Sequence, residues 1–151
     1  AKDVDADTSK FITDGKYKNG VLLGGTGAVS EAGETSLTKL EMTIERVYGK
    51  TRYTTSQEIN KKYAALFTGK KMAVATGENF PDALAGGGLC AKLKMPVVLV
   101  SDKAADSALE YIKGAAPEGL IVLGGAGAVS DEVAVKLAGG VKLPAAEADK
   151  K

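Results

Sequence analysis

Two arginines, Arg46 and Arg52, flank a short turn in a chain that otherwise uses lysine for positive charge. A guanidinium group offers a planar fork of N–H donors, which matches the two oxygens of a carboxylate or phosphate better than an ammonium group does. Lys50 lies between the two arginines and adds a third cation. This spacing predicts either contact with an anionic ligand or internal salt bridges, for instance from Arg52 to Asp82 or Glu78.

A second group of candidate residues lies between Thr76 and Gly88, directly after a predicted strand. Asn79 can cap the following helix, Pro81 suits its first turn, and Asp82 favours the positive end of the helix dipole. Ligands of open parallel sheets bind outside the carboxyl ends of the strands. The segment is therefore both a helix start and a candidate ligand site.

Three consecutive glycines, at positions 86 to 88, follow inside that predicted helix. Each glycine costs a helix roughly 1 kcal/mol relative to alanine. We therefore expect another helix, a second copy of the domain or a ligand to approach this backbone closely. Cys90 lies on the same helix, and we expect it to be buried against the sheet as a small hydrophobic side chain.

Two Gly-Gly-x-Gly turns, Gly24–Gly27 and Gly124–Gly127, each follow a predicted strand and precede a predicted helix. Backbone N–H groups and the helix dipole can hold an anion at such a place. Neither turn has the spacing of a dinucleotide or Walker loop, so nucleotide binding is not favoured. The alternative is that the glycines only permit a tight turn, with Ser30 and Ser130 at the helix starts.

Several classes of catalytic chemistry are excluded by composition. The chain has no histidine and one cysteine, so an internal disulfide, a multi-cysteine metal site and the Ser-His or Cys-His nucleophile pairs are ruled out. A net charge of +1 does not favour nucleic acid as a partner. Charge is uneven, however, because residues 39–71 hold eight basic and three acidic side chains. These lysines indicate solvated helix faces or a local basic surface.

Length and composition indicate an α/β domain. With 151 residues and 44% hydrophobic content, the chain can bury a core, and 5% aromatic residues with 19 glycines favour Val, Ile, Leu and Ala packed against a sheet covered on both faces. No apolar run approaches the length of a membrane span, so we expect no membrane partner. The polar N-terminus carries no leader-type segment, which predicts either a cytosolic protein or one whose export signal has been removed.

An internal repeat organises the chain. The ten residues Val21–Ser30 recur at Ile121–Ser130, an offset of 100 positions without a gap. A period of this length suits a small domain with its own core. We therefore predict that residues 10–38 are the C-terminal part of a preceding repeat, that 42–138 form a complete repeat, and that 139–151 are a tail or linker.

Strands and helices alternate along the predicted complete repeat. Apolar patterning predicts strands at 42–48, 71–76, 96–100 and 120–123, and helices at 54–67, 81–93, 105–114 and 129–137. Strict alternation of this kind implies a parallel sheet flanked by helices and joined by right-handed crossovers.

Four short motifs lie in a fixed order within this segment. They are Arg46-Val-Tyr-Gly49-Lys-Thr-Arg52-Tyr53-Thr-Thr55, Gly77-Glu-Asn79-Phe-Pro81-Asp82-Ala83-Leu84, Pro96-Val-Val-Leu99 and Leu123-Gly124-Gly125-Ala-Gly127-Ala-Val129-Ser130. Their order and spacing resemble the cell-wall-binding repeat 2 family, whose modules occur in clostridial surface proteins and related Gram-positive wall enzymes. The resemblance extends from Glu45 to Leu137, and Val21 to Leu37 resembles the end of another copy.

The resemblance implies a Toprim-like α/β fold, modules packed in threes and non-covalent attachment to an anionic polymer of the cell wall. It implies a surface location, neighbouring copies of the same module as partners in a trimer or pseudo-trimer, and no catalysis, cofactor or metal. The residues predicted to contact the polymer are Arg46, Lys50, Arg52, Thr55, Asn79, Asp82, Gly124 and Gly125.

Two other functions stay open. A purely structural module would use its repeats to pack against one another. A magnesium-dependent phosphoryl-transfer enzyme of the Toprim type would use Glu78, Asp82 and Asp102 near strand ends. Lys103 and Ala104 follow Asp102, so the usual Asp-x-Asp metal pair is missing.

Overall fold

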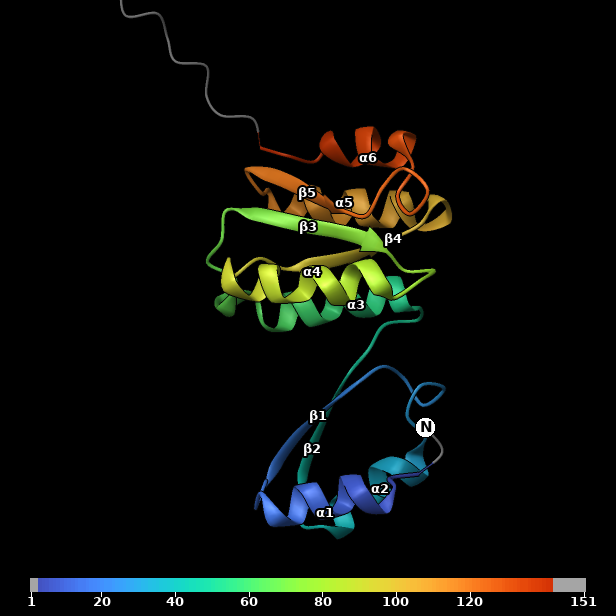
Figure 1. Cartoon of the computed structure of the whole chain (residues 1–151), viewed down its shortest axis with the longest axis vertical. Helices are drawn as coiled ribbons and strands as arrows, with labels where there is room; N and C mark the ends of the chain where they lie inside the picture. Colours follow the sequence, from blue (N-terminus) through green and yellow to red (C-terminus); the bar gives the residue numbers. More distant parts are fainter. Residues whose placement is uncertain (1–2, 143–151) are drawn as a thin grey trace, which may run out of the picture. The chain divides into compact units, whose positions relative to one another are not determined.

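The chain forms two compact units in a computed structural model that describes residues 3–142 (Figure 1). The first unit is Ala1–Ile59 and the second is Asn60–Lys151. The positions 143–151 of the predicted tail or linker lie outside the described residues, and the predicted repeat boundaries stay a prediction.

The first unit contains a two-stranded parallel sheet and its helices. Its elements are α1 (Ala6–Asp14), β1 (Asn19–Leu23), α2 (Glu31–Lys39) and β2 (Thr43–Val47), and α3 (Arg52–Lys62) runs across the division between the units. β1 pairs with β2 from Asn19 opposite Thr43 to Leu23 opposite Val47. The helices begin at side-chain caps, because Asp5 accepts from the Thr8 N–H at 2.7 Å and Ser30 from the Gly33 N–H at 3.1 Å.

The second unit contains a three-stranded parallel sheet in the order β4-β3-β5. Its elements are η1 (Ala64–Leu66), β3 (Lys71–Thr76), α4 (Pro81–Lys92), β4 (Val97–Val100), η2 (Asp102–Ala104), α5 (Ala105–Ala115), β5 (Gly119–Leu123) and α6 (Asp131–Ala138). The predicted α/β class, with parallel strands flanked by helices, is confirmed. The strands are parallel because each connection between them carries a helix.

The core of the second unit has two sides, as the alternation of side chains along β3 requires. Met72 and Val74 face a large cluster with Ile112 of α5 and Leu137 of α6. Ala73 faces the other side, where α4 lies over the sheet with Cys90. The helices of the two faces are drawn on opposite sides of the strands in Figure 1. A continuous apolar run in β3 therefore serves both faces at once.

The sequence prediction differs from the structure at two helix ends. The helix predicted over 54–67 is divided, because α3 ends at Lys62 and a separate turn of 3₁₀ helix covers Ala64–Leu66. Asn79 was expected to cap α4, but Phe80 holds the cap position and makes no side-chain capping bond, while Pro81 begins the helix as predicted. Within residues 3–142, no helix has the length and apolar content needed to cross a membrane.

The three glycines of α4 have different environments. A Cβ on Gly86 would lie closer to the Leu123 side chain than any contact distance allows, so α4 approaches β5 through the missing side chain. A Cβ on Gly87 or Gly88 would meet nothing within 4 Å in the described part of the chain. The expected close approach is therefore met inside the unit at Gly86 alone.

Candidate functional site

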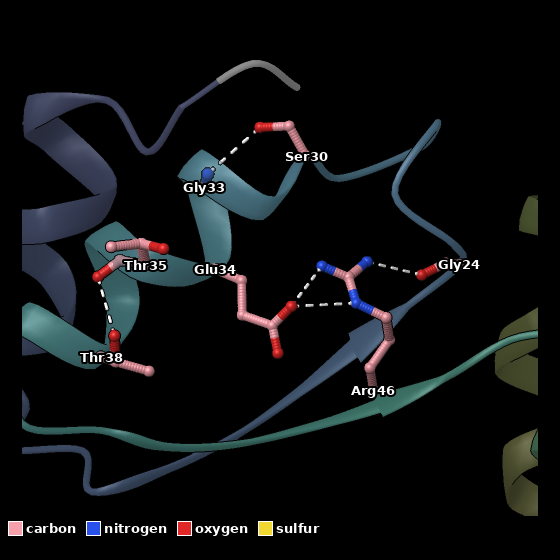
Figure 2. Close-up of polar contacts among 7 residues, drawn as sticks. All are labelled: Gly24, Ser30, Gly33, Glu34, Thr35, Thr38 and Arg46. Carbon is pink, nitrogen blue, oxygen red and sulfur yellow. Dashed lines mark hydrogen bonds and ion pairs between the residues drawn. The ribbon is translucent and has the colours of Figure 1, made fainter.

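The guanidinium group of Arg46 is held at the carboxyl end of the first sheet (Figure 2). Its Nε and Nη2 donate to Oε2 of Glu34 at 3.1 and 2.7 Å, and its Nη1 donates to the carbonyl oxygen of Gly24 at 2.8 Å. The side chains of Arg46 and Glu34 are 11% and 33% exposed. The planar fork anticipated from the sequence is therefore engaged by a carboxylate of the same unit, and its predicted contact with a polymer stays a prediction.

Glu34 lies on α2, a helix with side-chain hydrogen bonds near both of its ends. Ser30 caps its first turn, and the Glu34 N–H donates to the Ser30 carbonyl at 3.1 Å. Further along the helix, the hydroxyl of Thr38 donates to the Thr35 carbonyl at 2.8 Å (Figure 2). The sequence placed Ser30 at a helix start, but the approach of Glu34 to Arg46 required knowledge of how β1 and β2 pair.

The loop after β2 is folded by threonine hydroxyls. The Thr55 hydroxyl accepts from the Gly49 N–H at 2.9 Å, so this predicted contact residue is used to hold its own loop. Thr51 and Thr54 exchange bonds, with the Thr51 N–H donating to Thr54 Oγ1 at 3.0 Å and the Thr54 N–H to Thr51 Oγ1 at 3.2 Å. This reciprocal arrangement caps the start of α3 in the manner of a capping box.

The capped loop presents two cations to solvent. Lys50 and Arg52 are both exposed, on either side of Thr51. Gly49 cannot be replaced easily, because a Cβ there would overlap Thr54. The backbone before the two exposed cations is thus fixed, and exposed cations on a fixed loop can attract an anion.

The remaining predicted contacts lie at the carboxyl end of the second sheet. Asn79 is exposed in the loop after β3, and the Glu78 N–H donates to the Thr76 hydroxyl at 3.2 Å. Asp82 lies against the turn after β5, since its Oδ2 is 2.5 Å from the position that a Cβ on Gly124 would take. The structure therefore brings Asp82 and Gly124 together.

The eight predicted residues divide evenly between the two units. Arg46, Lys50, Arg52 and Thr55 belong to the first unit, and Asn79, Asp82, Gly124 and Gly125 belong to the second. Each group lies where parallel strands end and a Gly-Gly-x-Gly turn follows, which is where ligands of such sheets bind.

A hollow at the amino ends of the second sheet was not anticipated from the sequence. It has a volume of about 340 Å³ and is lined by residues that include Phe67, Tyr111 and Lys71. Asn60 lies at its wall with its side-chain amide donating to the Val97 carbonyl at 2.8 Å. Residues from four separate segments form the hollow, so no local sequence pattern marks it.

Asp102, one of the acidic residues considered as a magnesium ligand, accepts a hydrogen bond from a side chain. The Ser130 hydroxyl donates to Oδ1 of Asp102 at 3.4 Å. Within the described range 3–142, no group of three or more His, Cys, Asp or Glu side chains is close enough to hold a metal ion.

Cys90 is buried, as predicted, and packs with Ala73 and Met95. Burial raises the pKa of the Cys90 thiol above its ordinary value, because a thiolate is poorly solvated among apolar neighbours. Its burial and raised pKa favour a structural role for this thiol.

The model of the family described as Cell wall binding domain 2 (CWB2) matches residues 46–134. The first Gly-Gly-x-Gly turn lies before this match, and the second turn, α4 and the Lys50–Thr55 loop lie within it.

The chain is also similar to part of a longer protein. N-acetylmuramoyl-L-alanine amidase LytC of Bacillus subtilis (strain 168) is 29% identical over 132 residues, which cover 87% of this chain and 26% of the amidase. The chain thus spans about a quarter of that relative's length.

Two solved structures have a similar fold. Cwp6 from Clostridium difficile matches with a TM-score of 0.82 and 17% identity over 94% of this chain and 23% of that chain. Cwp8 from Clostridium difficile matches with a TM-score of 0.64 and 30% identity over 83% of this chain and 20% of that chain.

Proposed function

The chain belongs to the cell wall binding domain 2 family, and from that premise we propose that it anchors a secreted surface protein to a Gram-positive wall by binding an anionic wall polymer. The family match carries this proposal, since it extends over both the cationic loop and the second glycine turn. Binding a component of the cell wall is the function of the family, while the anionic polymer and the anchoring role are our proposal.

The charge chemistry of the first unit supports an anionic partner. Lys50 and Arg52 are exposed on a loop whose backbone is fixed by Thr55 and by the Thr51–Thr54 pair. A phosphate or carboxylate bound there would meet two cations on a loop whose backbone is already held in place. Arg46 supports this loop indirectly. Its hydrogen bonds to the Gly24 carbonyl and to Glu34 hold the end of β2, where the loop begins.

The module does not need high affinity on its own. Repeats of the module on one protein would bind one polymer chain together, and such avidity raises attachment by about 10²-fold or more without new contacts. A non-catalytic role agrees with this arrangement, because a site that only holds a polymer needs no nucleophile or general base.

A second candidate function is packing between modules. Phe80 and Leu84 at the start of α4 are exposed although both are large and apolar, and Gly87 and Gly88 have open space in front of them. An exposed apolar helix surface favours contact with another protein surface. Association of copies and binding of polymer do not exclude each other.

Co-sedimentation with purified Gram-positive cell walls tests the anchoring function. The chain should sediment with intact walls and remain in solution after the secondary polymers have been removed chemically. Equal binding to stripped walls would contradict an anionic secondary polymer as the ligand.

Two double variants with the same charge change locate the contact. Replacing Lys50 and Arg52 by glutamine should weaken binding to isolated polymer roughly tenfold at low salt, because two charge-assisted contacts are lost. Replacing Lys16 and Lys18 by glutamine removes the same charge at the amino end of β1 and should leave binding nearly unchanged. Equal losses in the two variants would show that only net charge matters.

A further inference from the structure

The hollow at the amino ends of β3, β4 and β5 has no part in the function proposed above. Its volume is about 340 Å³, and its described walls belong to the second unit, where β3 begins in Figure 1. Small-molecule sites in proteins start at about 300 Å³, and most are apolar with a few placed polar groups. The hollow is therefore large enough for one molecule the size of a sugar ring.

Most of the wall of the hollow is apolar. Two half-buried aromatic side chains line it, Phe67 and Tyr111. The other apolar side chains of the wall include Met72, Pro96 and Pro117. A pyranose ring has a face of C–H groups, which packs well on the electron-rich face of an aromatic ring. The wall therefore favours a ring with an apolar face over a ligand that is charged throughout.

The internal repeat places an aromatic residue at the matching position of the first unit. Phe11 is the counterpart of Tyr111, and its ring stacks on Tyr17 with centroids 5.4 Å apart. Both rings of this pair are exposed, Phe11 by 66% and Tyr17 by 49%. The repeat thus has an aromatic ring here where it is exposed as well as where it is half-buried, which core packing alone does not explain.

Asn60 places one polar group in this apolar wall. The residue is 4% exposed, and its side-chain nitrogen donates to the Val97 carbonyl at 2.8 Å, which orients the amide. Among residues 3–142, its side-chain oxygen accepts no hydrogen bond, and no side-chain oxygen is fully shut off from solvent without a partner. The small exposed area of Asn60 therefore includes this oxygen, which can accept from an N–H or O–H group in the hollow.

The end of α5 gives the same preference for donor groups. Ala115 is the last residue of this helix, Ala116 follows with a positive φ of 46°, and both line the hollow. The last carbonyl groups of a helix have no N–H partner within it and form the negative end of its dipole. Together with Asn60, they favour a neutral ligand with N–H and O–H donors inside the hollow over an anion.

The charged side chains of the hollow include one cation that is not neutralised. Lys70 pairs with Glu118 at 3.2 Å. Lys71 is exposed, and its carbon chain lies over Gly119, with Cγ 3.6 Å from the position that a Cβ on this glycine would take. Lys71 forms no ion pair with the other residues of 3–142. It is thus available to a negative group attached to a ligand whose neutral part lies in the hollow.

We propose that the hollow binds one N-acetylated sugar ring of the wall polymer. The ring packs against Phe67 and Tyr111, its acetamido N–H donates to Asn60, and a neighbouring negative group of the polymer lies near Lys71. An acetamido group joins one N–H donor to a methyl group, which suits a single acceptor in an apolar wall better than hydroxyl groups alone do. The proposal rests on the proposed function, because it takes the polymer as the ligand, and it adds a site distinct from the Lys50–Thr55 loop.

N-acetylglucosamine added to the full chain labelled with ¹⁵N tests the proposal. It should bind with a Kd of about 1 mM, as expected for a ligand of this size, and shift the signals of Gly69, Lys71, Ala116 and the Asn60 side-chain amide. Glucose, which lacks the acetamido group, and N-methylacetamide, which lacks the ring, should each bind roughly tenfold more weakly. Unchanged signals at the hollow, shifts confined to the Lys50–Thr55 loop, or equal binding of either control compound would overturn the proposal.

Two pairs of variants locate the ring and the negative group. Tyr111→Leu keeps an apolar side chain on α5 and should weaken binding of N-acetylglucosamine roughly tenfold, whereas Phe11→Leu at the matching repeat position should not change it. N-acetylglucosamine 1-phosphate should bind roughly fivefold more tightly than the sugar at low salt. Lys71→Gln should abolish this gain, and Lys103→Gln, with the same charge change at the end of β4, should keep it. Equal effects within either pair would contradict the proposed placement.

Sedimentation with purified walls distinguishes this proposal from the anchoring function. The double variant with Lys50 and Arg52 replaced by glutamine should sediment less and still bind N-acetylglucosamine with the parent's Kd. A chain that sediments with walls and does not bind the sugar would overturn the sugar site and leave the anchoring function standing. Sugar binding without sedimentation would support the site and contradict the anchoring function.

Discussion

β1 and β5 carry the same repeated sequence, yet their surroundings differ. Val21 and Leu23 of β1 are 45% and 52% exposed. Their counterparts Ile121 and Leu123 pack against the cluster beneath α4. Among residues 3–142, β1 has β2 at its side where β5 has no strand, and α4 lies over β5 where the matching side chains of β1 are exposed. The comparison teaches that the repeat determines its own turn and helix cap, while burial depends on which other elements are available to cover it.

The largest predicted difference between the two units is the stability that a buried leucine contributes, because the second unit has the larger core. Leu137 is fully buried in the large cluster of the second unit, whereas its counterpart Leu37 is 7% exposed in the smaller core of the first. Leu137→Ala should lower the free energy of unfolding of the second unit by about 3–5 kcal/mol, because it leaves a cavity among rigid neighbours. Leu37→Ala should cost about 2 kcal/mol or less.

Urea unfolding followed by hydrogen exchange, which reports on each unit separately, measures both values. An equal loss in the two units would break the comparison, because it would mean that the first core is as well packed as the second.

The next largest effect on stability is expected where α4 packs against β5. Gly86→Val should destabilise the second unit by about 1–3 kcal/mol, because the added carbons overlap Leu123. Gly87→Ala, one position further along, meets nothing within 4 Å and should instead stabilise the helix by up to about 1 kcal/mol. Thermal unfolding compares the two variants, and a destabilising Gly87→Ala would show that this surface is occupied in solution.

The ion pair that holds β2 should matter only in the first unit. Glu34→Ala leaves the nearly buried Arg46 without its carboxylate and should cost about 1–3 kcal/mol. Exchange of the Val47 and Gly24 amides should quicken accordingly. Glu31→Ala, on the same helix but exposed, is the control and should cost a few tenths of a kcal/mol. Similar costs for both variants would mean that Arg46 finds another partner.

The smallest effect concerns the helix starts. Hydrogen bonds from Thr8 hold the pKa of Asp5 below its ordinary value, whereas α5, the counterpart of α1, has no side-chain cap. A folded pKa below the unfolded one stabilises α1 at pH values above the unfolded pKa of about 3.9, and this stabilisation is lost as the pH falls through the folded pKa. Protection of the α1 amides against exchange, relative to their intrinsic rates at each pH, should therefore fall in acid, and this pH response should be lost in Asp5→Ala.

The second unit was largely predictable because its patterns are local. The apolar runs of β3 and β4 and Pro81 at the start of α4 indicated parallel strands joined by helices, and the structure confirms them. The repeat placed Ser30 and Ser130 at helix starts, and both are caps. Cys90 was expected to be buried and is buried.

What the sequence did not predict depends on contacts between distant segments. Arg46 was recognised as special, but its partner Glu34 comes from the helix before it, and only the pairing of β1 with β2 brings them together. Asn79 was expected to cap α4, yet Phe80 takes that position without a side-chain bond. The hollow lined by Phe67 and Tyr111 has no local signal because its walls come from separate segments.

The parallel pairing of β1 and β2 has a mechanical consequence for a surface protein under tension. A pulling force enters β1 at Asn19 and leaves β2 at Val47, at opposite ends of the two strands. The hydrogen bonds between parallel strands lie across this direction, so the load shears them together and does not open them one after another as in a zipper. The hydrogen bonds from Arg46 to Gly24 and Glu34 further resist the sliding of β2 along β1. The first unit has the smaller core, but this pairing of its strands should make it resist unfolding by a force applied along the chain.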